Sequence, residues 1–439
     1  MSRSYDILLE NATILTMRDE QPLAEGCVGV KDGRIALVGA LPEGAQAKRR
    51  IDCAGQILMP GLVNAHAHTP MCILRGYADD YPLHTWLFDK VFPAEARLDE
   101  RAVRAGALLG FAEQLCTGTT SVSDMYYFEP AIAKLALETG MRASLCNAVV
   151  ALGPDWLPEN DRALRETEAL IRDFHGAGDD LVRAEVSIHA EYTSQPRVWR
   201  MVAELARTHG LGLQVHLSET RKEHEEAKQR HGGKTAAQAL AGQGVFDGRA
   251  TAAHCVWLDE ADMALLAEKG VSAAHCPVSN LKLGSGTADI AALRRAGVNV
   301  ALGTDGCCSN NTHDLFKEVK LAALLAKGKA LDPTALSAYE ALKMATINGA
   351  KAQGRPDIGQ VAEGLRADLI LLDMDHPTTR PAYDPFGAVV YSATGRSVRL
   401  TMVQGRILYE DGIFTTIDIE KAYAEVERYA KPRAMGENI

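Results

Sequence analysis

Two histidines separated by one residue, His66 and His68, end an apolar run that begins at Ile57. Such a run predicts a buried strand, and alternate residues of a strand point to the same side. The two imidazoles therefore project together and can bind one metal ion. Thirteen histidines in 439 residues would give about 0.4 such pairs by chance, so the pair alone is compatible with a structural role. Polar residues later in the chain decide between the two roles.

The segment after residue 59 repeats one pattern. Helical stretches end in glycine, which supplies the left-handed conformation at a helix end, and a short apolar or β-branched run follows each of Gly118, Gly140, Gly210, Gly270 and Gly297. These repeats indicate βα crossovers and a parallel sheet. The eight predicted strands match a (β/α)8 TIM barrel, with a doubly wound sheet as the alternative, and end near Asn64, Asp124, Val150, His189, His216, His254, His275 and Thr304.

Both ends of the chain are β-like. Strands are expected at Tyr5–Leu9, Cys27–Lys31 and Arg34–Val38, with a hairpin turn at Asp32-Gly33, and again at Ala367–Asp373, Val398–Val403 and Arg406–Tyr409. We therefore predict an α/β fold in which residues 1–58 and 361–439 form one small β-sandwich with a terminal helix. Residues 59–360 form the barrel, with C-terminal helices expected over residues 311–329 and 333–353.

Bulk composition narrows the class of protein. A net charge of −10 and a pI near 5.8 argue against nucleic acid and anionic membranes as partners. The first residues lack the apolar core of a signal peptide. The nine cysteines are scattered without a CxxC motif, which fits reduced thiols in the cytoplasm, and the adjacent Cys307 and Cys308 are interpreted as small packing residues. A homo-oligomer is left open.

Polar side chains end most of the predicted barrel strands, where such barrels carry their active sites. Burying them unpaired would be costly, so the cluster predicts a ligand or ion; its members are His66, His68, His189, His216, His254, His275 and Asp305. Three imidazoles and a carboxylate form an open ligand set for zinc, with Fe²⁺ or Mn²⁺ as alternatives. No lysine ends the fourth strand to bridge two metals, which favours one ion. The expected metal ligands are His66, His68, His216 and Asp305.

Two further residues are expected to move protons. His254 would sit beside the bound water rather than on the metal. Glu219 stands three residues beyond His216, where its carboxyl group can exchange protons with a substrate.

This pattern resembles the amidohydrolase superfamily over nearly the whole chain. Several strings are similar to the deaminases that act on 5′-methylthioadenosine and S-adenosylhomocysteine: Leu74-Arg-Gly76, Trp86-Leu-Phe88, Pro93-Ala-Glu95, Asp124-Met-Tyr126, Ser279-Asn-Leu-Lys-Leu283, Gly303-Thr-Asp-Gly306 and Ser309-Asn-Asn311. Triazine hydrolases and guanine-type deaminases share parts of these strings and are the alternatives. A non-catalytic scaffold is disfavoured because every expected ligand is present.

The resemblance implies hydrolytic deamination of an adenine nucleoside. A divalent ion lowers the pKa of its bound water towards ~7. Asp305 would accept a proton from the attacking water, with His254 as electrostatic partner. Glu219 would protonate N1 of the purine, so that C6 is attacked and ammonia leaves.

The resemblance also implies substrate contacts. Glu95 would bind the ribose hydroxyls, His189 the nucleoside, and Trp86 and Phe88 the base or a thioether, while Ser309 supports Asp305. One position departs from the pattern, because Asn147 stands on the third strand where some relatives place an arginine for the carboxylate of S-adenosylhomocysteine. Arg162 or Arg165 could compensate. 5′-Methylthioadenosine or adenosine is therefore expected as a substrate at least as much as S-adenosylhomocysteine.

Overall fold

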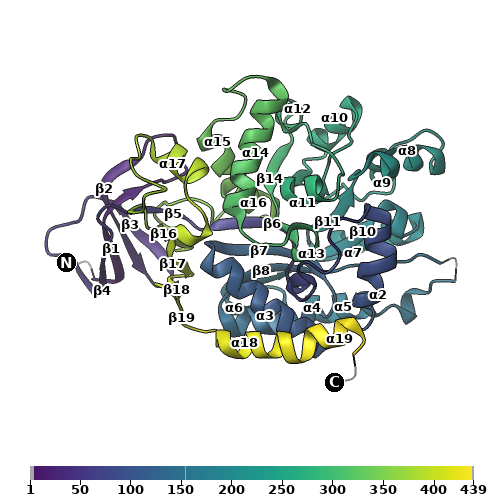
Figure 1. Ribbon diagram of the computed structural model, residues 1–439, viewed down its shortest axis with the longest axis horizontal. Helices are drawn as coiled ribbons and strands as arrows, with labels where there is room; N and C mark the ends of the chain where they lie inside the picture. Colours follow the sequence, from purple (N-terminus) through teal and green to yellow (C-terminus); the bar gives the residue numbers. More distant parts are fainter. Residues whose placement is uncertain (1–3, 154, 438–439) are drawn as a thin grey trace.

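The computed structural model describes residues 4–153 and 155–437, and two parts of the chain are visible in Figure 1. One part is a sheet that combines strands from both chain ends. The other is a ring of parallel strands enclosed by helices. Among the described residues, no helix combines the length and the apolar character that a membrane span requires.

The first part is a nine-stranded sheet, here called the terminal sheet. N-terminal strand β5 pairs antiparallel with C-terminal strand β16, so both ends of the chain are held in one sheet. Asp32 and Gly33 have φ of 50° and 75° and form the predicted turn between β2 and β3. The strands are β1 (Ser4–Ile14), β2 (Leu23–Lys31), β3 (Arg34–Gly39), β4 (Gln46–Asp52), β5 (Ile57–Pro60), β16 (Leu369–Leu372), β17 (Val398–Val403), β18 (Arg406–Glu410) and β19 (Ile413–Phe414).

The second part is the predicted barrel. Two five-stranded parallel sheets, β15-β6-β7-β8-β9 and β10-β11-β12-β13-β14, join because β9 continues into β10 and β14 leads into β15. These are eight strand positions in a closed ring, as the sequence predicts. The strands are β6 (Leu62–His68), β7 (Thr119–Tyr126), β8 (Arg142–Asn147), β9 (Val182–Ala184), β10 (Val186–Ala190), β11 (Leu213–Leu217), β12 (Ala250–His254), β13 (Ser272–His275), β14 (Asn299–Leu302) and β15 (Asp305–Gly306).

Helices surround the ring and bury its outer face. Those that follow or precede barrel strands are α3 (Glu100–Cys116), α4 (Glu129–Thr139), α5 (Arg162–Phe174), α7 (Pro196–His209), α8 (Arg221–Arg230), α9 (Ala236–Ala241), α10 (Glu260–Glu268), α11 (Pro277–Lys282), α12 (Ile290–Arg295) and α13 (Cys307–Asn310). All five glycines predicted to end helices have φ between 66° and 92°, which confirms this interpretation. Two short helical segments, η1 (Thr69–Leu74) and η2 (Trp86–Val91), precede α2 (Phe92–Glu95).

The helices after the barrel differ from the predicted ranges. The structure has α14 (Leu315–Ala330), α15 (Ala338–Met344) and α16 (Ile347–Ala352) instead of two helices over 311–329 and 333–353. Asn311 has φ of 73° and ends α13, so Asp314 becomes the cap of α14 by accepting from Phe316 N at 3.0 Å. Ser337 caps α15, because its side chain accepts from Glu340 N. Thr346, with ψ of −93°, separates α15 from α16.

The C-terminal segment returns to the barrel. In Figure 1, α18 (Ile419–Glu425) lies along α3, and α19 (Lys431–Met435) continues from it to pack against η1 and α2. Arg101 of α3 pairs with Glu425, with nitrogen to oxygen at 3.0 Å, and the Tyr429 hydroxyl donates to Asp99 at 2.6 Å. The last residues thus cover a barrel helix rather than the terminal sheet.

A buried ion pair connects the barrel to the terminal sheet. Arg142 at the start of β8 donates from Nε and Nη2 to both carboxylate oxygens of Asp368, at 2.6 and 3.0 Å, and the two side chains are 0% and 1% exposed. Asp368 also accepts from Gln404 N at 2.8 Å. Removal of one partner would leave the other buried without its counter-charge.

We expect Asp368→Asn to lower the free energy of unfolding by about 3 kcal/mol, because it leaves Arg142 charged and buried. Urea denaturation followed by circular dichroism would measure the loss. The matched control is Asp173→Asn, which breaks the exposed pair with Arg172 (68% and 46% exposed) and should leave the free energy of unfolding almost unchanged. Equal losses of stability in the two variants would contradict the conclusion that the buried pair of Arg142 and Asp368 stabilises the fold.

Candidate active site

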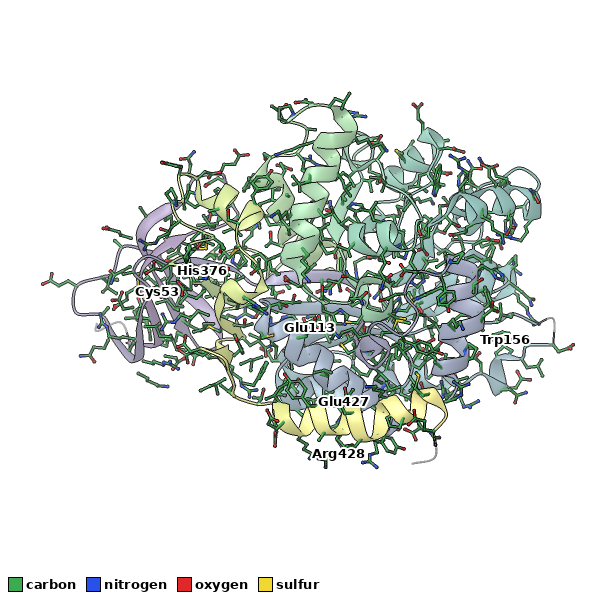
Figure 2. All side chains as sticks on the ribbon, viewed as in Figure 1. Cys53, Glu113, Trp156, His376, Glu427 and Arg428 are labelled. Atoms are coloured by element: carbon green, nitrogen blue, oxygen red, sulfur yellow. The ribbon has the colours of Figure 1, made fainter. Side chains whose placement is uncertain are left out.

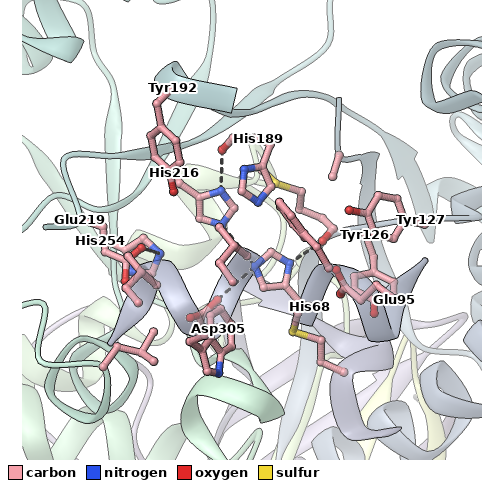
Figure 3. Close-up of a pocket in the computed structure, with 18 residues that line it drawn as sticks. His68, Glu95, Tyr126, Tyr127, His189, Tyr192, His216, Glu219, His254 and Asp305 are labelled. Atoms are coloured by element: carbon pink, nitrogen blue, oxygen red, sulfur yellow. Dashed lines mark hydrogen bonds and ion pairs between the residues drawn. The ribbon is translucent and has the colours of Figure 1, made fainter. Parts of the chain in front are cut away.

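The strand ends gather the predicted polar residues at one mouth of the barrel (Figure 3). Asp305 Oδ1 lies 3.5 Å from His66 Nε2 and 3.1 Å from His68 Nε2. His216 Nε2 lies 3.2 Å from His68 Nε2. Four residues thus bring their ligand atoms close together, although the first and the last of them are more than 230 positions apart in sequence.

His254 joins the same cluster. The ligand atoms of His66, His216, His254 and Asp305 all lie within 4.8 Å of one another. His254 Nε2 also lies 3.8 Å from Glu219 Oε2, so this imidazole faces both the cluster and the expected proton donor. The geometry brings together every predicted metal ligand and both predicted proton-transfer residues.

Hydrogen bonds fix the orientation of three imidazoles. His68 Nδ1 lies 2.5 Å from Met125 O, and His216 Nδ1 lies 2.6 Å from His189 O. When Nδ1 is held by a carbonyl, Nε2 is the ring nitrogen that is turned towards the cluster and can act as a ligand. His254 Nδ1 is likewise held by Asn280 Oδ1 at 2.9 Å.

Hydrogen bonds also fix the carboxylate of Asp305. Its Oδ2 accepts from the hydroxyls of Ser279 and Ser309 at 2.6 and 2.7 Å, which leaves Oδ1 for the imidazoles. The backbone of Asp305 and His254 is left-handed, with φ of 59° and 71°. Residues other than glycine adopt this conformation at a cost, and such strain concentrates at functional sites.

The cluster is built to surround a cation. His66 Nε2 is buried and has no hydrogen-bond partner. Burial alone would lower the pKa of His68, but the hydrogen bond and charge of Asp305 raise it to about 9. Although burial opposes it, contact with His66 and His68 holds the pKa of Asp305 well below its usual range. Imidazole nitrogens and one carboxylate oxygen form a donor set that fits a divalent metal ion.

Glu219 is placed by the start of the next helix. Thr220 and Glu223 form a capping box at the N-terminus of α8, and Glu223 accepts from the backbone N–H of Ser218 and Glu219, each at 2.8 Å. The side chain of Glu219 accepts from the Ser285 hydroxyl at 2.9 Å. Burial raises the pKa of Glu219 above its ordinary value, which favours the protonated form that can donate.

A cavity opens in front of this cluster (Figure 3), and its wall includes several apolar side chains. Trp86 and Glu95 line it, and so does His189, whose ring lies 4.7 Å from that of His216. Glu95 is 8% exposed, and its Oε1 has no hydrogen-bond partner. Burial raises the pKa of Glu95 to about 7. The remaining wall residues include Met71, Leu83, Leu87, Phe92, Tyr126, Tyr127, Ala148, Tyr192 and Leu283.

Some predicted residues lie elsewhere. Asn147 does not line the cavity: it faces helices α4 and α5, where its amide lies beside Thr167 and the backbone of Glu129. The next residue, Ala148, lines the cavity instead. His275 is buried outside the cavity wall, and Phe88 packs between the rings of His84 and Phe92.

Arg162 and Arg165 lie in the first turn of α5, and neither lines the cavity. Arg162 stacks on the Phe128 ring at 4.1 Å and pairs with Glu166 at 3.6 Å. Arg165 donates to Glu159 O at 3.1 Å. Among the described residues that line the cavity there is no lysine or arginine.

Sequence reasoning missed Tyr192 and the supporting residues Asn280 and Ser285. Tyr192 lines the cavity three residues after His189, and its position near a strand end was the available signal. Asn280 and Ser285 lie after β13, on the side of the cavity occupied by His254 and Glu219. Asn280 lies in α11 and Ser285 in the loop after it, and their contacts depend on the path of this segment, which no spacing rule indicates.

The amidohydrolase family model matches residues 57–408, well over half of the chain. The chain belongs to the amidohydrolase family. Two curated relatives cover almost its full length. A 5′-deoxyadenosine deaminase of Methanosarcina mazei is 42% identical over 97% of this chain and 98% of its own. A 5-methylthioadenosine/S-adenosylhomocysteine deaminase of Moorella thermoacetica is 41% identical over 96% of this chain and 98% of its own.

A solved structure has the same fold as this amidohydrolase. An adenosine deaminase from Xanthomonas campestris with bound zinc superposes with a TM-score of 0.93 at 32% identity, and covers 99% of this chain and 100% of its own. The barrel described above is therefore that of a family of metal-dependent hydrolases.

Proposed function

We propose that this amidohydrolase deaminates adenine nucleosides by hydrolysis, releasing ammonia and the corresponding inosine analogue. The observation that carries the proposal is the convergence of the imidazole–carboxylate cluster with Glu219 and His254 at one cavity. The names of the close relatives support an adenine nucleoside as substrate. They do not favour a triazine or guanine substrate.

His66, His68, His216 and Asp305 would hold one divalent ion, for which we propose zinc. When bound, such an ion supplies Lewis acidity and makes a bound water acidic near neutral pH. Asp305, fixed by Ser279 and Ser309, accepts a proton from the attacking water. His254 contributes positive charge beside it, because Glu219 and Asp305 raise its pKa against the effect of burial.

Glu219 donates its proton to N1 of the purine, which makes C6 electrophilic, and later helps to deliver a proton to the departing ammonia. Glu95 accepts hydrogen bonds from the ribose hydroxyls, which accounts for an unpartnered carboxylate oxygen in a cavity. His189 and Trp86 lie where they can contact the nucleoside.

The cavity favours a substrate with an uncharged 5′ group. Its wall has several apolar side chains and, within the described residues, no cation to pair with a carboxylate tail. We therefore expect 5′-deoxyadenosine and 5′-methylthioadenosine to be better substrates than S-adenosylhomocysteine.

Ammonia release from a panel of substrates tests this proposal. 5′-Deoxyadenosine, 5′-methylthioadenosine and adenosine should be deaminated, with kcat/KM for the first two at least about tenfold above that for S-adenosylhomocysteine. Guanine and a chlorinated s-triazine serve as comparisons. Turnover of either comparison compound without turnover of any adenine nucleoside would overturn the proposal.

We expect Glu95→Gln to lower kcat/KM for adenine ribosides about 10- to 100-fold, because a hydrogen bond to a charged acceptor contributes about 1.5–3 kcal/mol. The matched measurement uses 2′,3′-dideoxyadenosine, which lacks the ribose hydroxyls. The substitution should therefore change kcat/KM for this substrate only slightly. An equal loss of kcat/KM on both substrates would show that Glu95 does not bind the ribose hydroxyls.

We also propose the arrangement of the domains. Residues 59–360 form the catalytic barrel unit, and residues 1–58 and 361–439 form a β-sandwich with a terminal helix. Two apolar clusters in the terminal sheet support two layers, one around Leu9, Val28 and Leu369 and the other around Tyr5, Leu8 and Leu37.

A further inference from the structure

A second group of ligand-type side chains lies behind the active site, separate from the cavity. Cys72 of η1, Cys307 of α13 and His313 bring their sulfur and nitrogen atoms within 4.8 Å of one another. Both thiols also point at Glu113 of α3, which is labelled in Figure 2. We propose that these four residues bind a second divalent metal ion, of the thiolate-preferring class to which zinc belongs.

The distances fit one face of a tetrahedron. The two sulfurs are 3.4 Å apart, and they lie 3.7 and 3.8 Å from Glu113 Oε2. Ligands at the usual zinc–sulfur and zinc–oxygen distances stand about 3.5–3.8 Å apart in a tetrahedral site. The separations of three of the four donor atoms are thus close to those of ligand atoms around one metal ion.

The fourth donor is an unpartnered nitrogen. His313 is 0% exposed, and its Nε2 has no hydrogen-bond partner. Its other nitrogen, Nδ1, lies 3.0 Å from the Thr304 hydroxyl, and its backbone N–H donates to Glu113 Oε1 at 3.0 Å. Ligating histidines are typically oriented in this way through the second ring nitrogen.

The local charges suit a divalent ion. Arg75 Nη2 lies 2.6 Å from Glu113 Oε2 and 3.4 Å from Cys72 Sγ. Two thiolates and one carboxylate would carry three negative charges, which Arg75 and a divalent ion would balance with a neutral His313. A buried site with matched charge avoids the penalty of isolated buried ions. The ion would tie η1, α3 and the segment after β15 together.

Cobalt substitution tests the proposal on the full chain. Thiolate ligation gives cobalt(II) an intense near-ultraviolet charge-transfer band, whereas the nitrogen and oxygen ligands of the catalytic cluster do not. The unaltered protein loaded with cobalt should show the band and bind two metal ions per chain. His216→Ala should keep the band while it loses one ion, which separates this site from the proposed catalytic one.

The double variant Cys72→Ser/Cys307→Ser should lose the band and one bound ion. The matched control is Cys27→Ser/Cys53→Ser, which changes two buried thiols of the terminal sheet and should lose neither; Cys53 is labelled in Figure 2, well away from Glu113. A cobalt-loaded unaltered protein without the band would overturn the proposal. So would a mass two hydrogens below the reduced chain, assigned to a Cys72–Cys307 disulfide.

Discussion

The Glu219→Gln variant is expected to keep about one thousandth of the kcat of the unaltered enzyme on its best adenine nucleoside. Glutamine has the same shape and can still accept from the Ser285 hydroxyl, but it cannot transfer a proton. Proton transfer by a positioned side chain contributes about 10²–10⁴-fold in rate. KM should change little, because the loss falls on the transition state.

The pH profile gives a second readout of the same substitution. Burial raises the pKa of Glu219, so the proton-donating form persists to higher pH than in an exposed glutamate. As the pH rises through this raised value the donor is lost, and kcat falls. The variant should lack this decline.

Ser285→Ala is the matched control for Glu219→Gln. It removes a hydrogen bond to the carboxylate and leaves the carboxylate in place, so kcat should fall less than about tenfold. A Glu219→Gln enzyme that keeps more than a tenth of the activity would remove Glu219 from the proposed mechanism.

The barrel and the cluster at its mouth could be predicted from the sequence for physical reasons. Glycines at helix ends mark five of the βα units, and parallel strands bring their carboxyl ends to one side of the barrel. His66, His216 and Asp305 could therefore be placed together without any knowledge of the loops. The family model and the solved structure agree with the predicted barrel.

The orientation of Asn147 could not be predicted from the sequence. All residues of β8 are buried, so the strand has no solvent-exposed face to reveal which side chains point into the barrel. Cys146 and Ala148 pack together with Met125, and alternation turns Asn147 towards the helices. An error of one position in a strand exchanges the two faces.

Cys72, Cys307 and His313 show a second limit. They come from a short helical segment, from the start of α13 and from the loop before α14. No periodicity links these positions. Only the packing of η1 against α3, and of α13 against η1, brings them beside Glu113.

The largest effects are expected at the cluster itself, where two histidines have similar positions but different proposed roles. His68→Ala should lose one bound ion, and activity should fall by about 10⁴-fold or more because the acidity of the bound water is lost with it. His254→Ala should keep its metal and lose about 10²–10³-fold in kcat. Metal analysis of each purified variant, together with kcat, would measure both.

The distinction rests on the contacts of the two rings. His68 Nε2 lies 3.1 Å from Asp305 and 3.2 Å from His216 Nε2, between two other donors, whereas His254 Nε2 also has the Glu219 carboxylate at 3.8 Å as a partner. His275→Ala is the control for loss of a buried imidazole outside the cavity, and it should keep the ion and most activity. If His254→Ala loses the ion and His68→Ala keeps it, the ligands are the tight group of His66, His216, His254 and Asp305, and His68 becomes the residue that faces the attacking water.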